Sequence, residues 1–296
     1  MEYLSRSLMF VPAHNKKLMD SACKISADIL LPDIEDSVQP AENKQVARNN
    51  IINYIHDGRL KNRILFPRIN DRESGHLLQD IYQLTIDGIT GFVYPKATCG
   101  QDIYFIGKLL ETIEYEKGFP IGKFKLIPLI ETTGAVLNVQ EICKASTRVV
   151  AIAFGCEDYV TDLGGEHDAD GVSIFMARSR IAMAAKEAGI VPIDTVHIKV
   201  HDLEDLEKNL MLSKKLGFEG MLVLNPKELP LVHKYYSPSQ EDIKWAKEIL
   251  TSATLAEQEG RGVAIINNKF IGPPMVKMAK DILKKEQLIN NKEYNE

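Results

Sequence analysis

The chain has 296 residues, a formal net charge of −5 and 45% hydrophobic residues. This length accommodates two average domains or one large α/β barrel, and the acidic balance argues against a nucleic-acid partner. Apolar runs such as residues 149–154 are far too short to cross a bilayer, and the N-terminal segment lacks a signal-peptide pattern, so we expect a cytoplasmic protein with no membrane partner.

Short apolar, β-branched runs recur through the first 230 or so residues, with helical stretches between them. Repeated βα units of this kind form a parallel sheet, and eight of them close into a barrel. We therefore predict an α/β fold, a (β/α)8 TIM barrel. The predicted strands are Ser7–Val11, Asp28–Leu31, Arg63–Phe66, Gly91–Tyr94, Lys125–Ile130, Val149–Phe154, Thr195–Val200 and Met221–Leu224.

Helix signals fill the gaps between these strands. A helical spacing of apolar residues covers 41–55, and two later helices are predicted to stop at Gly189 and Gly217, where a left-handed residue commonly ends a helix. After Tyr236 the alternation of short apolar runs and helical stretches ends, and Ser239 is placed to cap a new helix. We therefore divide the chain into a barrel domain, residues 1–236, and a C-terminal helical extension, residues 237–296.

The ends of the predicted strands carry polar side chains. In a barrel of this kind the catalytic groups follow the C-terminal ends of the strands. A single polar strand end is unremarkable, but five of them at one rim indicate a site. The residues in question are Asp33, Glu35 and Asp36 after strand two, Arg68 after strand three, Lys96 after strand four, Glu131 after strand five and Asp158 after strand six.

Glu131 and Asp158 come from adjacent strands, so their like charges would repel at the barrel mouth. A proton, a cationic side chain or a divalent metal must offset that repulsion. Carboxylate oxygens are hard donors that favour Mg²⁺ or Mn²⁺ over Zn²⁺, and Mg²⁺ leaves positions open for water or substrate oxygens. Each residue taken alone is equally compatible with a surface ion pair or a helix cap.

Arg68 is the predicted anion clamp, because its planar fork can hold a carboxylate or an oxyanion bidentately. This combination suits a small carboxylated substrate. We expect one or more of Asp33, Glu35 and Asp36 to order Arg68 or metal-bound water, although a solvated loop or a helix cap is the alternative. Lys96 can be read as a Schiff-base lysine of a class I aldolase, but more often such a residue is an ion-pair partner.

Several other sites are disfavoured by the motifs. The histidines show no HExxH or triad spacing, and the glycines make neither a P-loop nor GxGxxG after a strand. The four cysteines have no CxxC or Cys/His spacing, which argues against structural zinc and a disulfide framework.

At the strand ends the sequence resembles the HpcH/HpaI aldolase and citrate lyase superfamily, in particular its citrate lyase beta subunits and CoA-ester lyases. The resemblance covers most of the chain. It is carried by RSLMFVPAHNKKLMDSA, ADILLPDIEDSVQPAENKQVAR, PRIN around Arg68, YPKA around Lys96, LIETTGA, AFGCEDYVTDLG and GRGVAIINNKFIGPPMVKMAKDIL.

The resemblance implies a Mg²⁺-dependent carbon–carbon lyase acting by reversible Claisen or aldol cleavage. The substrate would be a small hydroxy or oxo acid, held as its CoA thioester of the citryl-, malyl- or citramalyl-CoA type. The resemblance also implies a homo-oligomer, a trimer or hexamer, whose C-terminal extension contacts a neighbouring subunit.

By motif position, the resemblance makes Glu131 and Asp158 the magnesium ligands and Arg68 the catalytic clamp on the oxo acid. Asp36 and Lys44 lie in a stretch similar to one that lines the substrate and CoA side. We place Lys96 with these substrate-binding residues.

The C-terminal extension departs from the family pattern. Relatives with lyase activity carry DGKMID, whose last aspartate transfers a proton, whereas this chain reads NNKFIG with Asn267 and Asn268 first and Gly272 last. Strand eight also ends LNP where relatives have IHP. Three hypotheses follow: a CoA-ester lyase with a divergent substrate, a metal-dependent aldolase acting on a free 2-oxo acid, or a catalytically impaired, metal-dependent binding or scaffold subunit.

Overall fold

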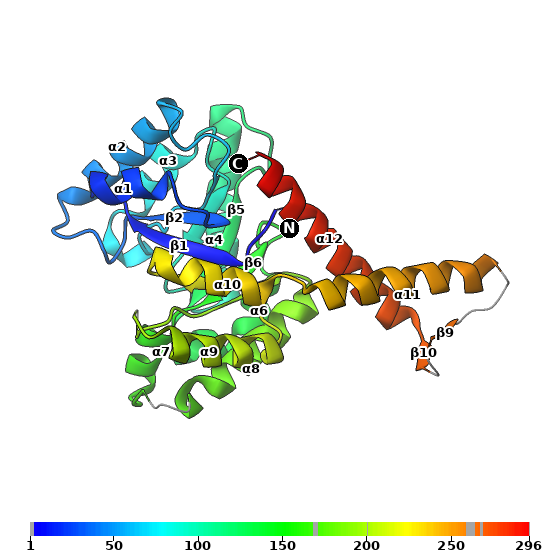
Figure 1. The fold of residues 1–296 in the computed structure, drawn as a ribbon. Helices are drawn as coiled ribbons and strands as arrows, with labels where there is room; N and C mark the ends of the chain where they lie inside the picture. The colour runs from blue at the N-terminus through cyan, green and yellow to red at the C-terminus, as the bar shows by residue number, and fades with distance from the viewer. Residues whose placement is uncertain (1–2, 168–170, 200, 259–263, 267–268, 296) are drawn as a thin grey trace. The chain divides into compact units, whose positions relative to one another are not determined.

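The computed structural model describes residues 3–167, 171–199, 201–258, 264–266 and 269–295 (Figure 1). Contacts divide the chain into two compact units, Ser5–His233 and Lys234–Glu296. The division falls within helix α10 (Leu229–Tyr236), the helix that also contains the predicted boundary. Among the described residues, no helix is both long enough and apolar enough to span a membrane.

The first unit is a barrel of eight parallel strands surrounded by helices, which confirms the predicted fold class (Figure 1). Its strands follow one another in the order β3-β2-β1-β8-β7-β6-β5-β4. The strands are β1 (Ser7–Pro12), β2 (Ile29–Asp33), β3 (Ile64–Leu65), β4 (Gly91–Tyr94), β5 (Lys125–Ile130), β6 (Ala151–Phe154), β7 (Val191–Asp194) and β8 (Gly220–Val223).

The ring closes between β3 and β4 through the backbone of β3 and of the segment around Arg68. Since β3 is only two residues long, single-residue bridges join Arg68 to Asp33 on one side and to Val93 on the other. The Arg68 N–H donates to the Pro32 carbonyl at 3.0 Å, and the Val93 N–H donates to the Pro67 carbonyl at 3.0 Å. The local backbone thus sets the direction in which Arg68 leaves the wall.

The core lies inside the ring and between the ring and its helices. Strands β2, β4, β6 and β8 are buried along their whole lengths, as expected of parallel strands covered on the outside by helices. Large side chains such as Phe66, Phe92, Phe124 and Phe154 have no exposed surface.

Two of the barrel helices stop where the sequence predicts. Helix α8 (Val172–Ala188) is followed by Gly189 at φ +71°, and α9 (Leu203–Leu216) by Gly217 at φ +95°. Glycine takes this left-handed conformation without a Cβ clash, which is why it ends helices. The other elements are α1 (Lys16–Ala22), α2 (Asn43–His56), α3 (Leu77–Leu84), α4 (Gly100–Lys117), α5 (Thr133–Leu137), α6 (Val139–Lys144), α7 (Cys156–Leu163) and the 3₁₀ helices Arg72–Ser74 and Pro226–Glu228.

The prediction of the seventh strand was wrong. The strand is Val191–Asp194, paired with β6 and β8, and not Thr195–Val200. The proline in VPID concealed it, because a proline in a run argues against a central strand. The β-branched residues after it instead form a loop, in which the Nε2 atom of buried His197 lies 3.0 Å from Asp205 Oδ2.

The second unit is built on two long helices, α11 (Gln240–Gln258) and α12 (Pro273–Asn295), and a hairpin of β9 (Ala264–Ile266) and β10 (Lys269–Ile271). The predicted start at Ser239 is confirmed, because Ser239 and Asp242 each accept a hydrogen bond from the other's backbone N–H. Its core contains Ala246, Ile249, Ala256, Ile271 and Ala279.

Candidate active site at the carboxyl ends of the strands

Arg68 is held by acids at the end of β2 and in the loop that follows it. Its Nε and Nη2 atoms donate to the two oxygens of Asp33, both at 2.7 Å. Its Nη1 atom lies 2.9 Å from Glu35 Oε2 and 3.5 Å from Asp36 Oδ2. The guanidinium also lies 4.8 Å from the centre of the Phe10 ring. One edge of the fork is thus fixed by Asp33, and the other faces acids that an incoming carboxylate would have to displace.

The three acids of this loop differ in environment. Asp33 and Glu35 are 1% and 3% exposed, whereas the Asp36 side chain is 56% exposed. Burial alone would raise the pKa of Asp33, but hydrogen bonds and charge from Arg68 lower it below its ordinary value. Burial dominates at Glu35 and raises its pKa to about 7, despite the charge of Arg68. Asp33 is therefore the permanent anionic partner of Arg68.

Glu131 follows β5 directly and is 2% exposed. Its Oε1 atom accepts a hydrogen bond from the backbone N–H of Lys96 at 2.6 Å. Burial, reinforced by the charges of Glu35 and Asp158, raises the pKa of Glu131 to about 8, although the Lys96 N–H and Arg68 oppose the rise. A buried carboxylate of this kind is poised to exchange its proton for a cation.

Asp158 lies in the first turn of α7 and is exposed. Strands β5 and β6 are adjacent, as expected, and the charge of Asp158 is close enough to influence the pKa of Glu131. Cys156, beside it, is buried, and burial raises the pKa of its thiol to about 12, so the thiol stays protonated at neutral pH. Beside Asp158, the side-chain atoms that can bind a metal ion at neutral pH are therefore carboxylate oxygens.

The two carboxylates fit a hard divalent cation with an incomplete protein shell. Within the described ranges, no group of three or more His, Cys, Asp or Glu side chains could hold a metal ion. Mg²⁺ is commonly held by one or two carboxylates, with waters and substrate oxygens completing its octahedron. Glu131 and Asp158 match that donor set.

Lys96 contacts Glu35 through its side chain and Glu131 through its backbone N–H. Its Nζ atom lies 2.8 Å from Glu35 Oε1 and 3.4 Å from Asp71 Oδ2, and its backbone has φ +51°. Partial burial lowers the pKa of the Lys96 ammonium, but these acids outweigh that effect and raise it. Lys96 is therefore an ion-pair partner, while its N–H holds Glu131. Asp71 was not predicted, because it belongs to no strand end.

Lys44, placed on the substrate side by resemblance, is 7% exposed. Its Nζ atom donates to the carbonyls of Ile34 at 3.2 Å and Glu35 at 3.0 Å, and to Asn70 Oδ1 at 2.6 Å. All three ammonium protons therefore have acceptors inside the protein. Lys44 fixes the shape of the loop that carries Glu35.

Gly155 leaves the space that Glu131 occupies. A Cβ atom on Gly155 would lie 2.9 Å from both Cβ and Oε2 of Glu131. The backbone of Gly155 has φ −102°, so the requirement for glycine is steric and does not come from its dihedral angles. The sequence signal for this contact is the glycine directly after β6, which strand-end reasoning passed over.

We expect Gly155→Ala to weaken Mg²⁺ binding by at least about 10-fold, the lower end of the loss seen when a ligand's supporting contact is removed. The added methyl group must displace the Glu131 carboxylate, and overpacking of this kind costs about 1–3 kcal/mol. The control is Gly134→Ala in α5, where a Cβ atom would meet nothing closer than 4.0 Å. Calorimetric Mg²⁺ titration compares the two variants, and equal affinities would contradict the steric argument.

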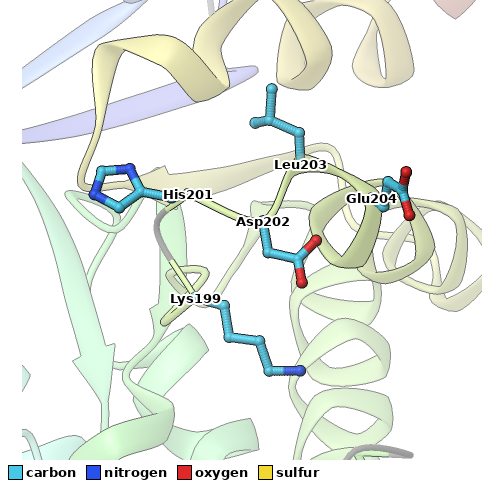
Figure 2. Close-up of a pocket in the computed structure, with 5 residues that line it drawn as sticks. All are labelled: Lys199, His201, Asp202, Leu203 and Glu204. Atoms are coloured by element: carbon cyan, nitrogen blue, oxygen red, sulfur yellow. The ribbon is translucent and has the colours of Figure 1, made fainter.

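A separate pocket of about 690 Å³ opens in the loop after β7 and at the start of α9 (Figure 2). Its lining contains none of the predicted site residues, and Asp202 is already engaged in capping α9 through the Asp205 N–H at 3.0 Å. This pocket does not define the candidate active site. It is lined by Lys199, His201, Asp202, Leu203 and Glu204.

In the C-terminal unit, Gly272 lies between β10 and α12, and its carbonyl accepts hydrogen bonds from the N–H groups of Met275 and Val276. It carries no group that transfers a proton. Asn267 and Asn268, which open the divergent NNKFIG pattern, lie outside the described residues.

Comparison with known proteins places this arrangement in a family. A family model described as HpcH/HpaI aldolase/citrate lyase matches residues 6–226. The citrate lyase subunit beta of Haemophilus influenzae is 32% identical over 282 residues, covering 95% of this chain and 97% of that protein. The L-malyl-CoA/beta-methylmalyl-CoA lyase of Rhodobacter capsulatus is 28% identical over 305 residues, covering 96% of this chain and 95% of that protein.

A solved structure of the citrate lyase beta subunit from Mycobacterium tuberculosis, complexed with oxaloacetate and magnesium, superposes with a TM-score of 0.65. It is 26% identical and covers 80% of this chain and 99% of that one. The family match runs from before β1 to beyond β8 and so includes every strand of the barrel and the whole rim. The chain therefore belongs to the HpcH/HpaI aldolase/citrate lyase family, and its reaction class is that of a carbon–carbon lyase.

Proposed function

We propose that the chain is a Mg²⁺-dependent lyase that cleaves, and in reverse forms, a carbon–carbon bond of a small hydroxy or oxo acid held as its CoA thioester. One observation carries this proposal. A buried carboxylate, Glu131, whose hydrogen-bond donor is a backbone N–H, lies at the same rim as an arginine fixed by acids. The relatives named as citrate lyase and malyl-CoA lyase support the choice of substrate class.

Each residue at the rim has a distinct part in the proposed reaction. Glu131 and Asp158 would hold Mg²⁺, which supplies a Lewis acid for a substrate oxygen. The Nη1 atom of Arg68 binds the carboxylate of the oxo-acid portion in place of Glu35, which lies 2.9 Å from it, because Nε and Nη2 are engaged by Asp33. A guanidinium that is already oriented needs little reorganisation as charge develops on the substrate.

Lys96 has a supporting part in this proposal. A Schiff-base mechanism needs a neutral amine, whereas Lys96 Nζ is ion-paired with Glu35 at 2.8 Å and its pKa is raised. The Lys96 N–H keeps Glu131 in place. Borohydride should therefore trap no substrate on Lys96.

A second candidate is a metal-dependent aldolase acting on a free 2-oxo acid, and Gly272 favours it. General acid–base catalysis contributes about two to four orders of magnitude in rate, and glycine cannot supply it. A free 2-oxo acid that enolises directly on a metal needs no proton-transferring group on the thioester side. A third candidate, a metal-dependent binding or scaffold subunit, would retain the ligands without turnover.

Chelation with EDTA is expected to abolish turnover, and excess Mg²⁺ to restore it. The measurement that separates the candidates is a thermal-shift series with Mg²⁺ and, in turn, CoA, acetyl-CoA, pyruvate, oxaloacetate and glyoxylate. A ligand at 100 times its Kd stabilises the folded state by about 2.7 kcal/mol, which gives a readily measured shift.

A shift with CoA compounds supports the lyase, and a shift with oxo acids alone supports the aldolase. Binding without product by mass spectrometry supports the scaffold subunit. Full turnover in EDTA would contradict every metal-dependent mechanism.

A further inference from the structure

A side-chain bridge links the segment after β5 to helix α7. Asp162, in the last turn of α7, accepts two hydrogen bonds at Oδ2: one from the Thr133 N–H at 2.7 Å and one from the Thr133 hydroxyl at 2.5 Å. These bonds hold the pKa of the Asp162 carboxyl below its ordinary value. Thr133 opens α5, so the Asp162 carboxylate satisfies an N–H that would otherwise lack a partner at the helix start.

Each end of the bridge is close in sequence to one of the two proposed magnesium ligands. Thr133 is two residues after Glu131, and Asp162 is four residues, about one helical turn, after Asp158. Side chains four residues apart lie on the same face of a helix, so Asp158 and Asp162 share one side of α7. Helices α5 and α7 are in contact, as this bridge requires.

The start of α7 is tied to the end of β5 through its N-cap, because the Gly155 N–H donates to the Ile130 carbonyl at 2.8 Å. The Asp162–Thr133 bridge is a second tie, one helical turn beyond Asp158. Glu131 is fixed on its own side by the Lys96 N–H and by contact with Gly155. Asp158 is exposed, and its position depends on where α7 lies. A divalent cation of the size of Mg²⁺ requires ligand oxygens near 2.0–2.1 Å, so a small movement of α7 against β5 changes the fit.

We infer that Asp162 is a positioning residue for the divalent cation, one that ties α7 to the segment after β5 and thereby sets the spacing of Glu131 and Asp158. This inference rests on the proposed magnesium site and goes beyond it by naming what holds the site together. Thr133 is the partner through which Asp162 acts.

The test is the dissociation constant of Mn²⁺, measured by EPR titration on the full chain. Asp162→Ala is expected to weaken Mn²⁺ binding by about 10- to 100-fold, the usual effect of removing a partner outside the metal's own ligands. Thr133→Val removes the hydroxyl bond but keeps the N–H bond to Asp162, so its loss should be smaller. Thr133→Ser keeps the hydroxyl and should retain wild-type affinity.

The double variant should lose no more affinity than Asp162→Ala alone, since Thr133→Val removes only one of the two bonds that Asp162→Ala removes. The matched control is Thr161→Val, next to Asp162 on α7, whose hydroxyl donates only locally to the Glu157 carbonyl at 3.0 Å. We expect its affinity to stay within about twofold of wild type. The metal-free protein should stay folded in every variant, with a lower unfolding midpoint in Asp162→Ala because α5 loses the acceptor for its first N–H.

Glu131→Gln and Asp158→Asn are measured in parallel. If both weaken Mn²⁺ binding and Asp162→Ala does not, the positioning role is wrong and the proposed metal site stands. If neither weakens it, the metal site itself is wrong and the positioning role is lost with it. An equal loss in Thr161→Val would also overturn the inference, because the effect would then belong to α7 in general.

Discussion

Glu131→Gln is expected to abolish Mg²⁺-dependent turnover and, at the same time, to make the metal-free protein more stable at pH 8. The first effect follows from losing one of two proposed protein ligands. The loss of Mg²⁺ affinity should exceed the roughly 10- to 100-fold that follows from removing a ligand's outer partner. Calorimetric titration and steady-state rates measure it.

The second effect follows from the pKa of Glu131, which rises from 4.5 to about 8 because the side chain is buried. Between these values the folded protein retains a proton that the unfolded chain releases. Stability is therefore complete below about pH 4.5 and decreases as the pH rises towards 8, by about 1.4 kcal/mol per pH unit. Glutamine is neutral at every pH, so in Glu131→Gln this position should not lower the free energy of unfolding as the pH rises.

Urea unfolding in EDTA at pH 5.5 and pH 8 provides the measurement. Wild type should lose free energy of unfolding between the two conditions, on the order of 3 kcal/mol from this group, and Glu131→Gln should lose distinctly less. Added Mg²⁺ should stabilise only wild type. The control is Glu111→Gln on α4, whose side chain is 43% exposed. A variant as sensitive to pH as wild type would show that Glu131 is ionised without metal.

Arg68→Ala is expected to destabilise the protein by about 3–5 kcal/mol, the usual effect of removing one partner of a buried ion pair. Asp33 would remain in the protein interior without its cation, and among the described residues Glu35 would keep only Lys96 as a cationic partner. Arg68→Lys should cost less, because it retains the charge, but it loses the two-pronged bond to Asp33 and the defined Nη1 edge. We expect both variants to lose oxo-acid binding.

The sign of the pH dependence is a second readout. The pKa of Asp33 is lowered in the wild type, so its contribution to stability is present above its ordinary pKa and is lost in acid. Without Arg68 burial dominates, and Asp33 should destabilise the fold as the pH rises. Arg72→Ala is the control, since the Arg72 side chain is 61% exposed and its pair with Asp102 spans 4.0 Å. A loss for Arg68→Ala below about 1 kcal/mol, the range of surface pairs, would contradict the argument.

Much of the barrel was predictable because buried parallel strands are continuous apolar runs. The bounds of β4 and β5 agree with the prediction, since GFVY is followed by Pro95 and KLIPLI by Glu131. The strand β7 was missed because VPID has only two apolar residues beside its proline, whereas KLIPLI has four, and because the β-branched run after VPID packs in a loop. Only the pairing with β6 and β8 distinguishes the two segments.

The residues at the rim could be predicted from the strand ends, but the burial and the partners of each residue could not. Three acids in four residues look alike in sequence, although Asp33 and Glu35 are buried and Asp36 is exposed. Lys44 likewise resembles a surface lysine, yet its ammonium is surrounded by backbone carbonyls and Asn70. These differences arise from packing between segments far apart in the chain, which local patterns do not encode.

The closure of the barrel through Arg68 has a dynamic consequence. The same residue supplies the guanidinium at the rim and the main-chain bridge between β2 and β4. A ligand that binds Arg68 should therefore protect this seam from local opening. Amide hydrogen exchange would report it, because the Ile34 N–H donates to the Arg68 carbonyl and the Ile69 N–H to the Val93 carbonyl. Slower exchange at these two amides would show that a ligand bound at the rim also stabilises the closure of the barrel.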